Sequence, residues 1–356
     1  MNSQFQDHDE RVASALVAMK ALSKSKAATI YEVAERAGVS IATVSRALRD
    51  SDLVTEATRA RVRAAVEALN YTPNQLGRSL AEGRHAANGI VFPDLTGPYY
   101  AEVVLGYEEV AAELGRSVLI LTTHGRRDAE AAVLDLAGRV DGLAVMGNTV
   151  GDESVRAVAA TGLPLVLLAR PPVDGVDTIR TRNERTAADL AEHLVAHGHR
   201  RIVFVGDPAA SPDAAGRYAG LARALRAHGL ARPELRVCDY DVDAGERVGA
   251  ELMADPPDAV VCANDEVALG VHLAAEAAGR RVPDDLAVTG WDDVLAARFA
   301  GLTTVSQPMR ELGATAARWL DGRIGERNTG PERAAPRRRV LPTRLVVRRS
   351  CGPHPK

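Results

Sequence analysis

The chain has 356 residues, of which 46% are hydrophobic and 26% charged, an ordinary composition for a globular protein with a sizeable core. The length suggests more than one domain, and no run approaches the ~18 uncharged apolar residues of a membrane helix, so no membrane partner is expected. Cys238, Cys262 and Cys351 form no C-x-x-C pair and the N-terminus shows no secretory signal, which excludes a disulfide scaffold and favours a cytoplasmic protein.

The formal net charge of −3 is unevenly distributed. Residues 1–85 hold 12 basic and 10 acidic side chains, residues 86–330 hold 24 and 36, and residues 331–356 hold 8 and 1. A mildly basic head and a basic tail therefore flank an acidic body. This asymmetry predicts that any contact with nucleic acid is confined to one part of the chain.

Residues 1–27 lack clear periodicity, and we expect them to form an extension without stable structure. Next come three predicted helices, each preceded by a hydroxyl side chain that can cap it. Thr29 and Glu32 have the spacing of a capping box at the start of a helix that ends at Ala37. Gly38 follows as the residue that terminates the helix. Ser40 precedes a second helix over 41–49, and Thr55 a third over 56–69.

The first two helices, residues 30–48, have the pattern of a DNA-reading helix-turn-helix. Val33, Val39, Val44 and Leu48 supply the predicted inner face, and Ala34 is small where the helices would cross. The outer face of the second helix carries small polar groups and a cation. An ordinary helical hairpin is the alternative, but the spacing, the caps and the third helix together favour the DNA-reading unit.

After Ala87, short apolar runs alternate with helical stretches, which predicts a parallel α/β architecture in two doubly wound lobes. The predicted strands are 89–93, 117–122, 142–146, 163–168, 201–205, 259–262 and 286–289. The predicted helices between them include 101–114, 184–196, 215–227 and 266–278.

The strings TIYEVAERAGVSIATVSRAL and VTEATRARVRAAVEALNYTPNQLGRSLAEGR resemble the headpiece of the LacI/GalR repressor family, and the resemblance extends from about Thr29 to Gly352. It implies an all-α helix-turn-helix headpiece over 28–73 and a hinge helix or linker over 74–86. It further implies an α/β two-lobed, periplasmic-binding-protein-like effector domain over 87–352, with a tail over 353–356.

In such a headpiece the second helix lies in the major groove. The resemblance implies that Ile41, Ala42 and Arg46 face base edges, where the Arg46 guanidinium can bind guanine O6 and N7. It implies that Thr43 and Ser45 contact phosphates. Where family members often carry Asn after this helix, this chain has Arg49-Asp50. The implied DNA-binding residues are Thr29, Ser40, Ile41, Ala42, Thr43, Ser45, Arg46, Arg49, Tyr71, Asn74 and Leu80.

Residues 74–82 resemble the family's hinge helix, which is too short to be stable alone in water. The resemblance implies that Leu80 inserts into a minor-groove step and kinks the duplex. A linker with one incidental apolar residue is the alternative.

The implied effector-binding residues are Asp94, Tyr99, Tyr100, Arg170, Arg217, Asn264, Trp291, Asp292 and Gln307. The Tyr100 ring would stack on the ligand, and the Arg217 guanidinium would donate hydrogen bonds to hydroxyls or to a carboxylate. The Asp292 carboxylate would accept hydrogen bonds from sugar hydroxyls. Where many members have Asp-Arg, this chain has Ala169-Arg170, so we expect an effector other than a common hexose.

The predicted function is therefore a transcriptional repressor that binds a palindromic operator as a homodimer and is controlled by a small molecule, a sugar or a sugar-like compound. A solute-binding module without a DNA role is the alternative. No phosphate-binding glycine motif supports an enzyme, and no cofactor is expected. His193, His197 and His199 have no Cys or carboxylate at metal-binding spacing, so we expect surface histidines and no metal.

Overall fold

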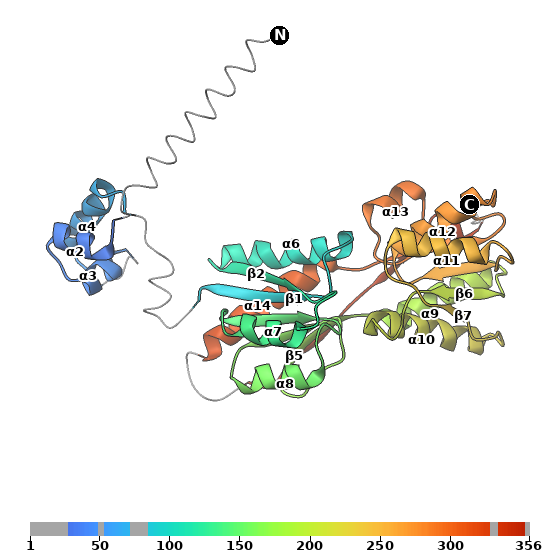
Figure 1. Ribbon diagram of the computed structural model, residues 1–356, viewed down its shortest axis with the longest axis horizontal. Coiled ribbons are helices and arrows are strands. Elements are labelled where there is room, and N and C mark those ends of the chain that lie inside the picture. The colour runs from blue at the N-terminus through green and yellow to red at the C-terminus, as the bar shows by residue number, and fades with distance from the viewer. Residues whose placement is uncertain (1–27, 49–52, 72–84, 328–333, 353–356) are drawn as a thin grey trace, which may run out of the picture. The chain divides into compact units, whose positions relative to one another are not determined.

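The computed structural model describes residues 28–48, 53–71, 85–327 and 334–352, and the chain divides into two compact units, Met1–Gly83 and Arg84–Lys356 (Figure 1). The predicted extension 1–27 and the predicted hinge 74–82 lie outside the described residues, and with them Arg49, Asn74 and Leu80.

The first unit, the headpiece, packs helices α2 (Ile30–Ala37), α3 (Ile41–Ala47) and α4 (Glu56–Ala68) around a small core. The predicted caps are present: Thr29 and Glu32 form a complete capping box, and the Ser40 and Thr55 side chains accept from the third backbone N–H of α3 and α4. Gly38 ends α2 with φ +63°, a left-handed conformation that glycine adopts without steric penalty. The core residues are Val33, Ala34, Ala37, Val44, Ala47, Val54, Val62, Ala65 and Tyr71.

One headpiece residue differs from expectation. Leu48, predicted for the inner face, is 36% exposed at the end of α3, because the helix ends at Ala47 and the chain turns there. Tyr71, for which DNA binding is predicted, lies in the core and is 9% exposed.

The second unit, the body, begins with a lobe built on a six-stranded sheet in the order β11-β5-β4-β3-β1-β2, with every pair parallel. Its strands are β1 (Ala87–Phe92), β2 (Ser117–Thr122), β3 (Gly142–Met146), β4 (Leu165–Leu168), β5 (Asp177–Thr181) and β11 (Arg338–Leu341). Helices α6 (Pro98–Glu113) and α14 (Met309–Arg327) cover one face, and α7 (Ala129–Ala137) and α8 (Asp152–Ala160) cover the other.

The second lobe repeats this plan on a smaller parallel sheet in the order β7-β6-β8-β9. Its strands are β6 (Ile202–Val205), β7 (Glu234–Arg236), β8 (Ala259–Cys262) and β9 (Ala287–Thr289). Helices α9 (Asn183–Ala196) and α10 (Pro212–Ala227) cover one face. Helices α11 (Val242–Leu252) and α12 (Asp265–Ala277) cover the other, and α13 (Leu295–Ala300) packs beside α12.

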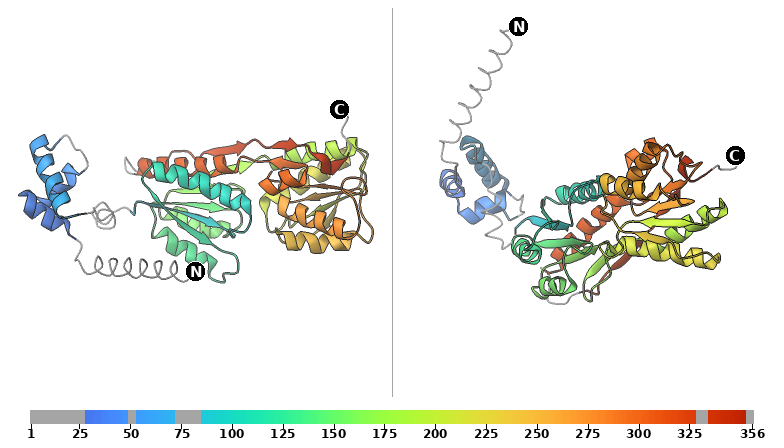
Figure 2. Two further views of the ribbon diagram at one scale, coloured as in Figure 1. Left: turned by 90° about the horizontal axis from the view of Figure 1, so that it is seen from above. Right: turned by 45° about the vertical axis from the view of Figure 1, so that its right-hand side comes forward.

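The chain passes between the lobes after β5, after β10 (Thr304–Ser306) and after β11. Strand β10 pairs antiparallel with β12 (Arg344–Val346), and the short 3₁₀ helix η1 (Arg349–Cys351) follows. In both views of Figure 2 the red C-terminal strands run along the body from one lobe to the other. The lobes are therefore joined by a narrow group of crossing segments.

The predicted alternation of strands and helices is confirmed, and three strands, β2, β3 and β8, have the predicted bounds. Helices α10 and α12 begin a turn or a residue earlier than predicted, because Ser211 and Asn264 cap them. The predicted elements do not include the helices α7, α8, α11, α13 and α14 or the strands β5, β7, β10 and β11.

Candidate DNA-binding face and effector cleft

The headpiece presents the outer face of α3 to solvent. Ser40, Ile41, Ala42 and Arg46 are exposed, whereas Val44 and Ala47 on the same helix are buried. Thr43 and Ser45 are partly exposed between these faces. Ile41 is 38% exposed although it is strongly apolar.

Thr29 and Ser40 have hydrogen-bond partners within the headpiece. The Glu32 N–H donates to the Thr29 hydroxyl at 3.4 Å, and the Thr43 N–H donates to the Ser40 hydroxyl at 3.2 Å. These bonds fix the first turns of α2 and α3. Both hydroxyls therefore have a structural role whether or not they also contact phosphate.

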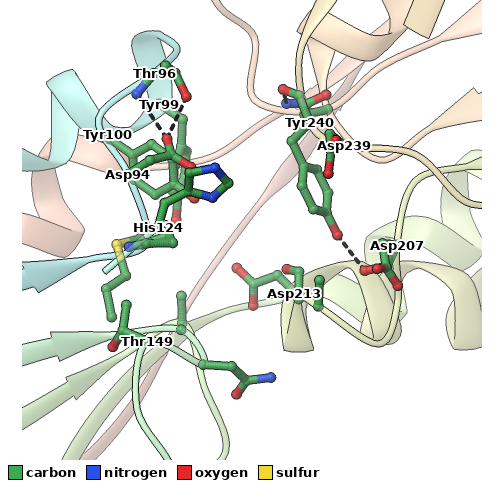
Figure 3. Close-up of a pocket in the computed structure, with 18 of the residues that line it drawn as sticks. Asp94, Thr96, Tyr99, Tyr100, His124, Thr149, Asp207, Asp213, Asp239 and Tyr240 are labelled. Atoms are coloured by element: carbon green, nitrogen blue, oxygen red, sulfur yellow. Dashed lines mark hydrogen bonds between the residues drawn. The ribbon is translucent and has the colours of Figure 1, made fainter. Parts of the chain in front are cut away.

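A cavity of about 490 Å³ lies between the two lobes of the body. Its wall comes from segments that follow the carboxyl ends of β1, β2, β3 and β4 in one lobe and of β6, β7, β8 and β9 in the other. Ligands of doubly wound folds bind at this edge of the sheet, and the volume is within the range of small-molecule sites. Figure 3 shows Tyr99, Tyr100 and Thr149 facing Asp213 and Tyr240 across the cavity.

The first lobe contributes an aromatic corner. Tyr99 and Tyr100 open α6 with their rings edge to face, 5.2 Å between centroids, and Tyr100 packs at 5.8 Å against Phe92. Asp94 accepts from the Thr96 N–H at 2.9 Å, which shapes the loop after β1. Burial, followed by the charges of Asp213 and Asp292, raises the pKa of Tyr99 well above its usual value, so its hydroxyl stays protonated.

The second lobe contributes a buried charge network around Arg217. Its guanidinium donates to the Asn183 side-chain oxygen at 3.0 Å and to the Ala263 carbonyl at 2.5 Å, and lies 3.9 Å from the Asp213 carboxylate. Asn183 in turn donates to Asp213 at 2.8 Å. Burial raises the pKa of Asp213, an effect that Arg217 and Asn183 oppose. Asp213, four residues before Arg217 and on the same face of α10, could have been found from that spacing.

Asp292 lines the cavity with a strained backbone. Its φ is +116°, a value that side-chain-bearing residues rarely adopt and that often marks functional sites. Burial raises the pKa of its carboxyl well above the usual value, and the Arg217 charge works against that rise.

Three expected ligand contacts lie behind the cavity wall. Gln307 donates to Asp292, and Trp291 is 1% exposed with its ring 4.5 Å from the Arg217 guanidinium carbon. Both support residues that line the cavity. The expectation for Arg170 is wrong for a different reason: its guanidinium turns away to the Val150 carbonyl at 3.0 Å and to Asp152 at 2.6 Å, whereas its neighbour Ala169 lines the cavity.

Asn264 lines the cavity as predicted, but its amide is already engaged. It caps α12 by accepting from the Val267 N–H at 3.0 Å and donates to the Tyr240 carbonyl and to Glu266, each at 3.0 Å. Several lining residues were not predicted, because only the folded chain brings them together: Thr149, His124, Asp207, Asp213, Asp239, Tyr240, Asp241 and Glu266.

The prediction that the histidines of α9 have no cysteine partner is also wrong. His193 and His197 are half-buried, and the structure brings both beside the buried Cys351, which is more than 150 residues away in the sequence. Sequence spacing could not show this cluster, because its members come from two distant segments.

The fold and the cleft define the body as a two-lobed, periplasmic-binding-protein-like domain, and the headpiece as a helix-turn-helix. Residues 29–74 match the model of the lacI family of bacterial regulatory proteins, and residues 191–351 match a periplasmic binding protein-like domain. The chain belongs to the LacI family and is a DNA-binding transcriptional regulator. No described helix is long and apolar enough to cross a membrane.

The chain is similar along most of its length to characterised regulators. It is 31% identical to the transcriptional repressor CytR of Escherichia coli K12, over 93% of this chain and 98% of that protein. It is 32% identical to catabolite control protein A of Priestia megaterium, over 82% and 91%. Among solved structures, the lac repressor dimer bound to operator and an anti-inducer matches with a TM-score of 0.82 and 30% identity, over 92% of this chain and all of that one.

Proposed function

We propose that this regulator is a repressor that binds a palindromic operator as a homodimer, and that a small polyhydroxy compound in the cleft changes its affinity for DNA. Two headpieces are needed because each reads one half-site, and the two-fold symmetry of a dimer mirrors the palindrome. The effector acts by closing the lobes, which alters the segments that lead to the headpieces.

For DNA contact we propose the exposed face of α3. Arg46 is the one side chain on that face that can bind a guanine edge through two parallel hydrogen bonds, and Ile41 and Ala42 offer apolar contact. Ser40, Thr43 and Ser45 are suited to phosphates, which position the helix without reading sequence. Thr29 caps α2 and Tyr71 belongs to the core, so their contribution to binding is to hold α2 and the core in place. Arg49, Asn74 and Leu80 remain predicted contacts.

The charge of the cavity restricts the chemistry of its ligand. Arg217 and His124 are the lining side chains able to carry a positive charge, against a larger set of carboxyl groups. An anionic effector such as a phosphorylated sugar would be repelled by that set, whereas hydroxyl groups can donate to it. The lining carboxyl groups are Asp94, Asp207, Asp213, Asp239, Asp241, Glu266 and Asp292.

The observation that carries this proposal is a set of buried polar atoms without a hydrogen-bond partner among the described residues. Tyr99 Oη and Thr149 Oγ1 in one lobe and Glu266 Oε1 in the other all belong to residues that line the cavity. A buried polar atom left unpaired costs about 1–3 kcal/mol, so a ligand with several hydroxyls gains free energy by pairing them. A relative of 31% identity, the regulator CelR, has a solved complex with cellobiose.

The experiment is a thermal-shift and calorimetric screen of the full chain against neutral sugars, amino sugars, phosphorylated sugars and sugar acids. We expect binders among the neutral or amino compounds, and a change in operator affinity when a verified binder is added. Tight binding confined to phosphorylated or acidic compounds would contradict the ligand class. A verified binder without effect on operator titration would contradict the allosteric control.

For the dimer we propose a contact through the exposed apolar side chains of α12 and α13. Leu273, Leu295 and Phe299 are 46%, 64% and 79% exposed, and the two helices pack against each other. A second copy is the occupant that the palindromic operator requires. Phe299→Glu should shift the sedimentation profile toward monomer and weaken operator binding, whereas Glu276→Gln on α12 should change neither. Unchanged sedimentation of the Phe299→Glu variant would rule out this face as the interface.

A further inference from the structure

The second lobe holds a cluster of metal-ligating side chains that is separate from the cleft. His193 lies in the last turn of α9, His197 caps that helix, and Cys351 ends η1 at the other end of the body's sequence. One ligand atom from each residue lies within 4.8 Å of the other two. Neither the DNA-binding face nor the cleft includes any of the three.

The geometry of the cluster suits a tetrahedral ion. His193 and His197 are four residues apart and so lie on one face of the helix, with ring centroids separated by 4.4 Å. His193 Nε2 lies 3.2 Å from Cys351 Sγ. Zinc bonds of about 2.0–2.1 Å to nitrogen and about 2.3 Å to sulfur separate neighbouring ligand atoms by about 3.5 Å. Small rotations of the two rings are therefore enough to bring all three atoms to one ion.

The surroundings hold the ligands in place. Thr303 Oγ1 lies 2.9 Å from Cys351 Sγ, and His199 Nε2 lies 2.9 Å from the Cys351 carbonyl oxygen. A Cβ added to Gly352 would lie 3.4 Å from the His197 ring, so the backbone after the cysteine runs close to that imidazole. Outer hydrogen bonds of this kind orient the ligands of metal sites. The carbonyl end of α9 also favours a positive charge.

We propose that His193, His197 and Cys351 bind one Zn²⁺ ion, which ties the C-terminal segment of the body to the end of α9. Two imidazoles and one thiolate form a donor set that zinc prefers over magnesium or calcium, which take oxygen ligands. Binding displaces the thiol proton and replaces the hydrogen bond between His193 and Cys351. The fourth position of the ion is open to a water molecule or a further ligand.

The location gives the ion a structural consequence. Cys351 follows β12, and β12 pairs with β10, one of the segments that cross between the lobes. Thr303, which contacts the Cys351 sulfur, lies directly before β10. A metal bound here therefore fastens the crossing segments to the second lobe and stabilises that end of the body.

The experiment is zinc titration of the full-length protein, freed of metal with a chelator, in competition with a chromophoric zinc indicator. We expect one tightly bound zinc per chain and a higher unfolding temperature with zinc than without it. Cys351→Ser and His193→Gln should each weaken binding more than about a hundredfold, because even outer-shell partners of a metal cost 10–100-fold when removed.

Matched controls separate this site from the other histidines and thiols. His228→Ala removes the corresponding exposed cap of α10, and Cys238→Ser removes a partly buried thiol outside the cluster, so neither should change zinc affinity. Cobalt(II) supplies a second readout, a thiolate-to-cobalt charge-transfer band that Cys351→Ser abolishes and Cys238→Ser keeps. Far-ultraviolet circular dichroism of the metal-free variants verifies that they fold.

Equal zinc affinity in the wild type, Cys351→Ser and His193→Gln would overturn the proposal, as would a cobalt spectrum without a thiolate band. The cluster would then be a hydrogen-bonded pair of imidazoles and a thiol. Because the titration uses no DNA and no sugar, its outcome is independent of the proposed operator and effector.

Discussion

The headpiece and the cleft use polar side chains in opposite environments. On α3 the polar groups and Arg46 are exposed, and the helix beneath them is held by a small apolar core. In the cleft, Asp213, Arg217 and Asp292 are buried and constrain one another. An exposed face can bind a highly charged polymer in a salt-dependent way. A buried network instead discriminates small ligands by hydrogen bonds that are costly to leave unmade.

The difference predicts that the cleft is the more fragile of the two regions. Removing one charged side chain from the cleft leaves the remaining charges buried without a partner of opposite sign. Removing one charged side chain from α3 leaves no buried charge behind, because the neighbouring groups are solvated by water. The following changes test this, in order of decreasing expected effect.

Arg217→Ala should have the largest effect. It leaves two buried carboxyl groups, Asp213 and Asp292, without their cation, and breaking a buried pair in this way costs about 3 kcal/mol of unfolding free energy. Urea unfolding of the full chain measures the loss, and calorimetry should show effector binding abolished. Arg223→Ala on the same helix is the control, because its ion pair with Glu184 is exposed and worth at most about 1 kcal/mol. Equal losses in the two variants would contradict the network.

Arg46→Ala should cost about 1–3 kcal/mol of operator binding and relax the preference for guanine at one position of each half-site. Its side chain is exposed, so unfolding of the headpiece should be unchanged. Fluorescence anisotropy with operator and substituted duplexes measures both effects. Arg61→Ala, which removes an exposed cation from α4, should at most weaken binding to all duplexes alike. A similarly uniform loss for Arg46→Ala would show that Arg46 contacts phosphate.

Glu266 should make the stability of the body depend on pH. Burial, the largest cause, raises the pKa of its carboxyl from 4.5 to about 7. Between these values the folded state binds more protons than the unfolded state, so the free energy of unfolding falls as pH rises from about 4.5 to about 7.

Glu266→Gln removes the carboxyl group that titrates, so the free energy of unfolding should fall less steeply with rising pH. Part of the pH dependence should remain, because the pKa of buried Asp265 is also raised to about 7, mainly by burial. Thermal unfolding across this pH range measures the slope, and exposed Glu276→Gln on the same helix should leave it unchanged. A slope identical in wild type and Glu266→Gln would show that the carboxyl titrates alike in both states.

Thr29→Ala should have the smallest effect, a loss of about 1 kcal/mol confined to the headpiece, because it removes one cap from an exposed helix end. Thr29→Ser keeps the acceptor and should restore most of the stability. Hydrogen exchange of α2 amides measures the change without interference from the body. Faster exchange of the body amides as well would show that the two units unfold together.

The headpiece was predictable from sequence because its signals are local. Each cap lies within three residues of the N–H that it accepts from, and the core-facing Val62, Val66 and Leu69 repeat at helical spacing. The misassigned residue, Leu48, lies where a helix ends, and there the direction of the chain decides burial. Periodicity carries no information about that direction.

Residues of the cleft were predictable only where a short segment of the sequence, a buried strand followed by a polar residue, places the side chain by itself. Asn264 and Asp292 each follow a buried strand, and both line the cavity. Arg170 and Trp291 follow strands as well, but neighbours from other segments, Asp152 and Arg217, draw their side chains away from the wall. Partners so distant in sequence cannot be inferred from spacing, and this also hid the two imidazoles beside Cys351.

The cavity takes its wall from loops and the first turns of helices at the ends of strands, while each lobe keeps a hydrophobic core of its own on both faces of its sheet. A loop residue of the wall can therefore change without disturbing either core. Such an arrangement lets the ligand preference of the cleft change through substitutions in its loops, whereas changes in the buried Arg217 network also cost stability.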